Sequence, residues 1–83
     1  MNNSRVPETF EDFVRHRVGK NIRRMRRANN WTMTKLSQLT GFSDHVISRW
    51  EGGLTVPNTV SLLWLCKRTG WKVSDILGGT KDG

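Results

Sequence analysis

The chain has little of what membrane, secreted or metal-binding proteins require. Its longest purely apolar run, Leu62 to Cys66, is far shorter than the roughly 20 residues of a membrane-spanning helix, and its polar N-terminus has no signal-peptide core. One cysteine cannot form an internal disulfide, and with His16 and His45 it supplies too few ligands for a metal. We therefore expect a soluble cytoplasmic protein that binds no metal or other cofactor and does not associate with a membrane.

Catalytic residue patterns are also missing from the 83 residues. There is no Ser-His-Asp or Cys-His arrangement, no paired carboxylate and no phosphate-cradling glycine loop at a usable spacing. Asp44 and His45 are adjacent, so on a helix they point in different directions. We expect neither an enzyme nor a pocket for a small-molecule ligand.

Acidic residues are scarce relative to basic ones. Lysine and arginine number 14 against 7 aspartates and glutamates, which gives a formal net charge of +7. An excess of this size favours a polyanionic partner, either a nucleic acid or an anionic membrane surface. Because no segment is suited to a membrane, the charge favours nucleic acid.

The apolar residues predict an all-α fold of five helices. Tyrosine is absent, prolines number two, and Phe10, Val14, Val18, Ile22 and Met25 recur at helical spacing in a long first helix, which we place after Pro7 and before Asn29. The later helices are predicted to start near Thr32, Ser43, Asn58 and Ser74, and to stop at Gly41, Gly52, Gly70 and Gly78. We expect one domain over residues 8–78, with a flexible N-terminus (1–7) and a flexible tail (79–83).

The middle of the chain has the spacing of a helix-turn-helix. Met33 to Gly52 spans twenty residues, and Gly41 occupies the ninth position, where a tight turn is needed. The two helices are expected to pack through Leu36, Phe42, Ile47 and Trp50. This unit places its second helix in the DNA major groove.

From about Gly19 to Leu77 the chain resembles the lambda-repressor-like, XRE-type family of helix-turn-helix regulators. The resemblance is carried by Ile22 to Arg26, Trp31 to Leu36, Ser43 to Glu51, Gly53, Pro57 and Asp75 to Leu77. It implies a five-helix domain, here with an extended first helix, that regulates transcription in the bacterial cytoplasm or nucleoid. It also implies sequence-specific binding of a double-stranded DNA operator as a symmetric homodimer, and we expect a repressor of bacterial or phage origin.

The exposed face of the third helix is the predicted base-reading surface, formed by Asp44, His45, Ser48 and Arg49. Arg49 can pair with guanine or contact a phosphate. Asp44 either accepts from a cytosine amino group or acts locally at the positive end of the helix dipole.

Contacts with the DNA backbone are predicted around this face. The start of the second helix offers amides and polar side chains, the end of the first helix offers cations, and the loop after the third helix offers main-chain amides. The residues are Thr32, Met33, Thr34, Lys35, Gln38, Arg23, Arg27, Gly53 and Thr55. Met33 departs from the family pattern, which often has glutamine there. The cations of the first helix divide around it, so we expect only some to reach phosphates.

Two further sets of residues receive structural roles. Arg26 lies on the apolar stripe of the first helix and needs a carboxylate partner, and in the proteins that this chain resembles the residue at Glu51 is that partner. Val60, Trp64 and Trp71 are read as an exposed strip that forms the dimer contact, the alternative being that the long first helix covers them.

A second function competes with operator binding. The same fold can serve as a protein-binding module, such as an antitoxin, with a regulatory protein as its partner. The docking surface would then be the extended first helix with Phe10 and Phe13, or the strip of Val60 and Trp64.

Overall fold

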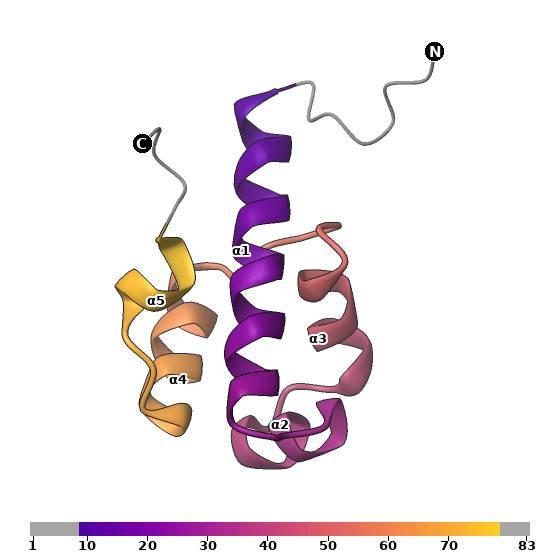
Figure 1. Cartoon of the computed structure of the whole chain (residues 1–83), viewed down its shortest axis with the longest axis vertical. Helices are drawn as coiled ribbons and strands as arrows, with labels where there is room; N and C mark the ends of the chain where they lie inside the picture. The colour runs from indigo at the N-terminus through magenta and orange to yellow at the C-terminus, as the bar shows by residue number, and fades with distance from the viewer. Residues whose placement is uncertain (1–8, 79–83) are drawn as a thin grey trace.

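The computed structural model describes residues 9–78 and contains five helices in that range. They are α1 (Phe10–Ala28), α2 (Met33–Thr40), α3 (Asp44–Glu51), α4 (Thr59–Thr69) and α5 (Val73–Leu77) (Figure 1). The predicted all-α, five-helix architecture is confirmed. The two segments predicted to be flexible, 1–7 and 79–83, lie outside the described residues, as does the first domain residue, Glu8. None of the five helices has the length and apolarity that crossing a membrane would need.

Short polar side chains start the first four helices. At α1, the Thr9 hydroxyl accepts a hydrogen bond from the Asp12 amide. The caps predicted for the next three helices, Thr32, Ser43 and Asn58, accept in the same way from the amide three residues later. These side chains satisfy amides that have no carbonyl partner in the first turn, so the cap positions fix where each helix begins.

The fifth helix starts earlier than predicted. It begins at Val73 rather than after Ser74, because the Asp75 carboxylate accepts a hydrogen bond from the Lys72 amide at 3.0 Å. An acidic residue in the third helical position reaches back to the preceding amide and stabilises the first turn. The side chain that stabilises the start of α5 is therefore Asp75 and not the predicted Ser74.

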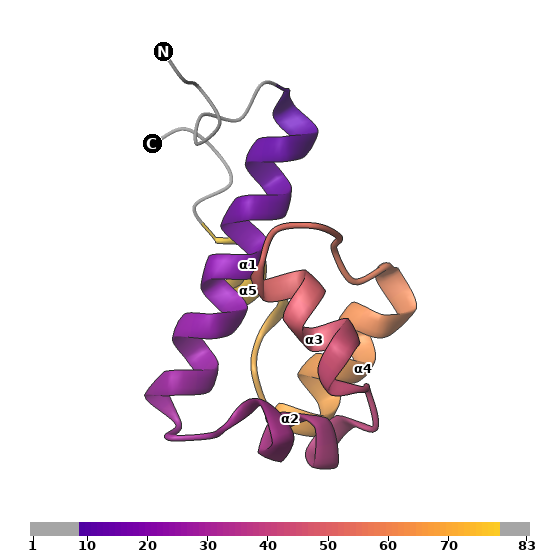
Figure 2. The same ribbon diagram turned by 90° about the vertical axis from the view of Figure 1, so that its right-hand side faces the viewer.

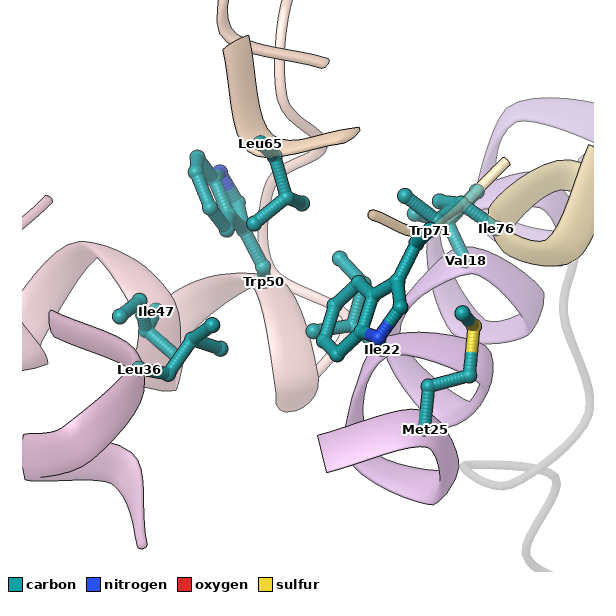
Figure 3. Packing of buried hydrophobic residues seen from close by; sticks show 9 residues of the cluster. All are labelled: Val18, Ile22, Met25, Leu36, Ile47, Trp50, Leu65, Trp71 and Ile76. Carbon is teal, nitrogen blue, oxygen red and sulfur yellow. The ribbon is translucent and has the colours of Figure 1, made fainter. Parts of the chain in front are cut away.

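The helices enclose one core, to which all five contribute (Figure 3). Figure 3 shows Leu36 of α2 beside Ile47 of α3, and Trp71 beside Ile22 of α1. All of these side chains except Trp71 are fully buried, and Trp71 is 8% exposed. Its ring stacks on Trp31 with the centroids 5.9 Å apart. The prediction that Trp71 is exposed is therefore wrong, because its ring packs on the half-buried Trp31 where the α1–α2 and α4–α5 connections meet.

The long helix α1 forms one side of the molecule. It packs against α3 and α5, whereas α2 packs against α3 and α4 (Figures 1 and 2). Its first turns extend beyond the ends of the other helices, so Phe10 is 73% exposed while Val18 and Ile22 are buried. The apolar stripe predicted along α1 is thus a core stripe only from Val14 onward.

A glycine allows α1 and α3 to approach closely. A methyl group at Gly19 would lie 2.2 Å from the carbonyl oxygen of Trp50 and 3.0 Å from that of Glu51. Gly19 is buried in the middle of α1. The absence of a side chain there sets the distance between α1 and the end of α3.

Candidate nucleic-acid interface

The turn between α2 and α3 is held by local hydrogen bonds. Gly41 ends α2 in the left-handed conformation, with φ of 88°. The Ser37 hydroxyl donates to the Phe42 carbonyl at 2.6 Å, and the Phe42 amide donates to the Thr40 hydroxyl at 3.2 Å. The Phe42 ring then meets Trp50 edge-on, with 4.9 Å between the centroids. These contacts fix the angle at which α3 leaves the turn.

Opposite faces of α3 have opposite roles. Ile47 and Trp50 are buried against the core, and Val46 packs against its edge. The four predicted base-reading residues are all exposed on the other face: Asp44, His45, Ser48 and Arg49. Because the buried face prevents α3 from rotating, these side chains are presented as a set.

The start of α2 lies next to the start of α3. The Thr34 hydroxyl lies 3.4 Å from a carboxylate oxygen of Asp44, so the polar surfaces of the two helices are continuous. This contact favours the local role for Asp44 over the alternative in which it reads a cytosine. Lys35 and Gln38 are exposed on the same helix, as predicted.

Met33 lies differently from its neighbours. Its side chain is half-buried and packs against the core. A thioether donates no hydrogen bond, so only the main-chain amide of Met33 is suited to a phosphate. The Thr32 hydroxyl accepts from the Lys35 amide, which leaves the first amides of α2 pointing outward.

The loop after α3 is less available than predicted. Gly53 is buried, its amide donates to the Trp50 carbonyl at 3.1 Å, and the His16 ring covers its α-carbon. The Leu54 amide likewise donates to the Arg49 carbonyl at 3.0 Å. The predicted backbone contact at Gly53 is therefore wrong, because the loop uses its amides to close the end of α3. Thr55 is only half-buried.

An ion pair ties α1 to the end of α3. Arg26 donates to both carboxylate oxygens of Glu51, at 2.7 and 2.9 Å, and a third nitrogen–oxygen contact joins it to the Trp31 carbonyl at 2.9 Å. The hydrogen bond to Glu51 raises the pKa of Arg26, whereas burial alone would lower it. The structure contains the pair that the sequence predicted, and its position holds α3 against α1.

Four cations of α1 lie on one face of the helix, although the sequence predicts that its cations are spread around it. Lys20, Arg23, Arg24 and Arg27 line one shallow depression on the outer surface of α1. Their spacing of three, four and seven residues places them on one face of a helix, and this spacing is the signal that the sequence reading did not use. Lys20 and Arg24 therefore join the predicted phosphate contacts Arg23 and Arg27 on this surface.

The exposed apolar surface of α4 differs from the predicted strip. Val60 is 77% exposed and Trp64 is 44% exposed, so α1 does not cover them. Leu63, which the sequence reading did not select, joins them one turn along the helix. The Trp64 indole also donates to the Thr40 carbonyl at 2.7 Å, which caps α2. The strip that remains on the surface is Val60, Leu63 and Trp64, without Trp71.

A second apolar surface lies at the start of α1. A groove of about 400 Å³ runs between this helix and the loop that follows α3. It is lined by Phe10, Glu11, Val14, Arg15, Leu54, Thr55 and Val56. Phe13 stacks beside Phe10, with 6.3 Å between the ring centroids.

Comparison with known proteins agrees with the helix-turn-helix geometry. The model of a family described as a Cro/C1-type HTH DNA-binding domain matches residues 21–82. The antitoxin PezA of Streptococcus pneumoniae serotype 4 is 28% identical over 64 residues, which cover 77% of this chain and 40% of PezA. The chain therefore spans less than half the length of that relative. No solved structure is significantly similar to the chain.

Proposed function

The chain belongs to the Cro/C1-type helix-turn-helix DNA-binding family, and from this membership we propose that it is a sequence-specific regulator of transcription, acting as a repressor in the bacterial cytoplasm or nucleoid. The observation that carries the proposal is the exposed polar face of α3, opposite the buried Ile47 and Trp50. This face is formed by Asp44, His45, Ser48 and Arg49. A helix held in this way presents its side chains to base edges in the major groove. Its function is binding, and no catalytic step is assigned to it.

Within this proposal, base and phosphate contacts fall to different elements. His45 and Ser48 contact base edges, and Arg49 donates to a guanine or to the adjacent phosphate. The start of α2, from Thr32 to Lys35 with Gln38, receives a phosphate through outward amides and polar side chains. Arg23, Arg27 and Thr55 meet flanking phosphates. Occupancy of the operator then excludes RNA polymerase.

We further propose that two copies bind together through α4. Val60, Leu63 and Trp64 form the exposed apolar strip that a second copy would bury. Two copies related by a twofold axis place their α3 helices roughly 34 Å apart on one side of the duplex, so the operator is an inverted repeat. Sedimentation of Trp64→Ser at micromolar concentration tests this contact. We expect more monomer than in the wild type, and an unchanged distribution would remove α4 from the interface.

Selection of bound duplexes from a random library tests the proposed function. The purified chain is incubated with the library at near-physiological salt, and the retained duplexes are sequenced. We expect an enriched inverted repeat. Retention without enrichment would mean that the net positive charge binds DNA without reading it.

A second candidate function is binding to a partner protein. It is favoured by the apolar groove at the start of α1 and by the similarity to an antitoxin. The groove residues Phe10, Val14 and Leu54 lie at the part of α1 that extends beyond the other helices. Phe10→Ser would weaken binding of such a partner while leaving DNA selection unchanged, because Phe10 lies at the start of α1, away from the residues proposed to contact DNA.

A further inference from the structure

Four cations form a ridge on the outer surface of α1, and the helix-turn-helix leaves two of them unexplained. Lys20, Arg23, Arg24 and Arg27 line a depression of about 320 Å³ and are all exposed. No apolar side chain contributes to its lining. We call these four side chains, between which the depression lies, the α1 ridge.

Among residues 9–78, only the Glu51 carboxylate lies within ion-pair distance of a ridge residue. Glu51 lies closest, 3.5 Å from Arg23, but its side chain is 1% exposed and already binds Arg26 through two hydrogen bonds. The other acids in this range are at the first turn of α1, beside Thr34, and at the start of α5. Like charges three and four residues apart on a helix repel each other, so the ridge destabilises the free protein.

The position of the ridge is set by what its edges touch. Arg23 borders α3 through Glu51. On the other edge Arg24 donates to the Asn21 side-chain oxygen at 2.9 Å, and Asn21 donates to the Ile76 carbonyl at 2.8 Å. The ridge therefore lies on the exposed side of α1, with one edge next to α3 and the other edge next to α5. Figure 2 shows α1 along one edge of the molecule, with α3 and α4 on its other side.

We propose that Lys20 and Arg24 extend the phosphate contacts of Arg23 and Arg27 along α1, so that the α1 ridge binds nucleic-acid phosphates beyond the surface formed by α2 and α3. The four residues span about 10 Å of helix rise. Successive phosphates of one DNA strand are spaced about 3.4 Å apart along the duplex axis, so roughly three of them fit this length. Because the chain belongs to a DNA-binding family, the partner that we propose for this surface is a nucleic acid rather than an acidic protein.

The double variant Lys20→Gln/Arg24→Gln tests the ridge, since neither residue is needed for the proposed reading of bases. Lys67→Gln/Lys72→Gln is the matched control: it removes the same charge from exposed positions on α4 and before α5. The dependence of the DNA dissociation constant on salt is measured for each protein. For each bound copy, the ridge variant should make the slope of log affinity against log salt shallower by about two, at roughly 0.9 per lost phosphate contact.

Two duplex designs identify the source of the phosphates. If the ridge variant changes the salt slope only when the bound site is extended by flanking DNA, the ridge contacts the same duplex as α3. If the variant changes the slope on a short site only when a second duplex is present, the ridge contacts a separate DNA segment. An unchanged slope, or an equal loss in the control variant, would overturn the proposal.

The proposed function can fail separately. The inference rests on it only for the choice of nucleic acid as ligand, and Ser48→Ala/Arg49→Ala should remove sequence preference without removing the ridge's share of the salt slope. If the wild type shows no sequence preference but the ridge variant still makes the salt slope shallower, the proposed function is wrong and the proposal of a phosphate site on the ridge is supported.

Discussion

At the scale of single residues, Glu51 has the largest structural consequence. Its carboxylate is buried and accepts from Arg26 on the neighbouring helix, while Arg23 approaches from the exposed side. A buried arginine that loses its carboxylate partner retains an uncompensated charge. The pair therefore matters to DNA binding indirectly, through the position of α3.

We predict that Glu51→Ala lowers the free energy of unfolding by about 3 to 5 kcal/mol, since it leaves Arg26 buried and unpaired. Urea denaturation followed by circular dichroism measures the change. Arg23→Gln is the control and should cost less than about 1 kcal/mol, because the Arg23 side chain is 50% exposed. A loss for Glu51→Ala no larger than that for the control would contradict the buried pair.

Cys66 supplies a prediction about pH. Burial raises the pKa of its thiol, and the negative charge of Asp75 adds to the effect. A pKa that is higher in the folded than in the unfolded chain stabilises the fold below the unfolded pKa, and this stabilisation is lost as the pH rises through the folded pKa. Iodoacetamide should therefore modify the folded chain at pH 8.5 more slowly than the urea-unfolded chain. Equal rates would show that the thiol behaves as an exposed one.

At the scale of helices, the contact between α1 and α3 fixes the position of the predicted base-reading face. Gly19 permits this contact, since a methyl group there would overlap the Trp50 carbonyl. Replacing glycine by alanine inside an ordinary helix stabilises it by up to about 1 kcal/mol. The close approach reverses the expected sign here.

We predict that Gly19→Ala destabilises the protein by about 1 to 3 kcal/mol, as overpacking does in a well-packed interior. Thermal unfolding of Gly19→Ala is compared with that of Lys20→Ala, the next residue on the same helix, which is exposed and should be close to neutral. A Gly19→Ala variant as stable as the wild type would mean that α1 and α3 are farther apart.

The helix pattern explains which features the sequence could predict. Helix caps such as Thr32, Ser43 and Asn58 act within three residues, so a local pattern locates them. The faces of α3 follow from its helical period in the same way. The burial of Trp71 depends on Trp31, forty residues earlier, and no local spacing indicates that stack.

The same limit applied to the interface. The sequence predicts that Gly53 offers its amide to DNA, because the hydrogen bond to Trp50 and the contact with His16 exist only where α1 packs against the loop. Lys20 and Arg24 were within reach of sequence reasoning, because their spacing on α1 already places them on one face. The residues of the base-reading face remain predictions until DNA contacts are measured.

At the scale of the whole molecule, the fold distributes its charge and its apolar surface over separate faces. α3 presents polar side chains, the α1 ridge presents cations, and α4 presents Val60, Leu63 and Trp64. The proposed binding of DNA by one face and of a second copy by another would require such a separation. Loss of one surface should therefore leave the others functional.

The central claim is that α3 reads DNA sequence, and the most direct measurement is a ratio of dissociation constants. Wild type and Ser48→Ala/Arg49→Ala are each titrated, at physiological salt, with the duplex enriched by selection and with a shuffled duplex of the same composition. Specific regulators prefer their sites by about 10³ or more, and we predict such a ratio for the wild type and a much smaller one for the variant. A wild-type ratio near one, or equal ratios for the two proteins, would contradict the claim.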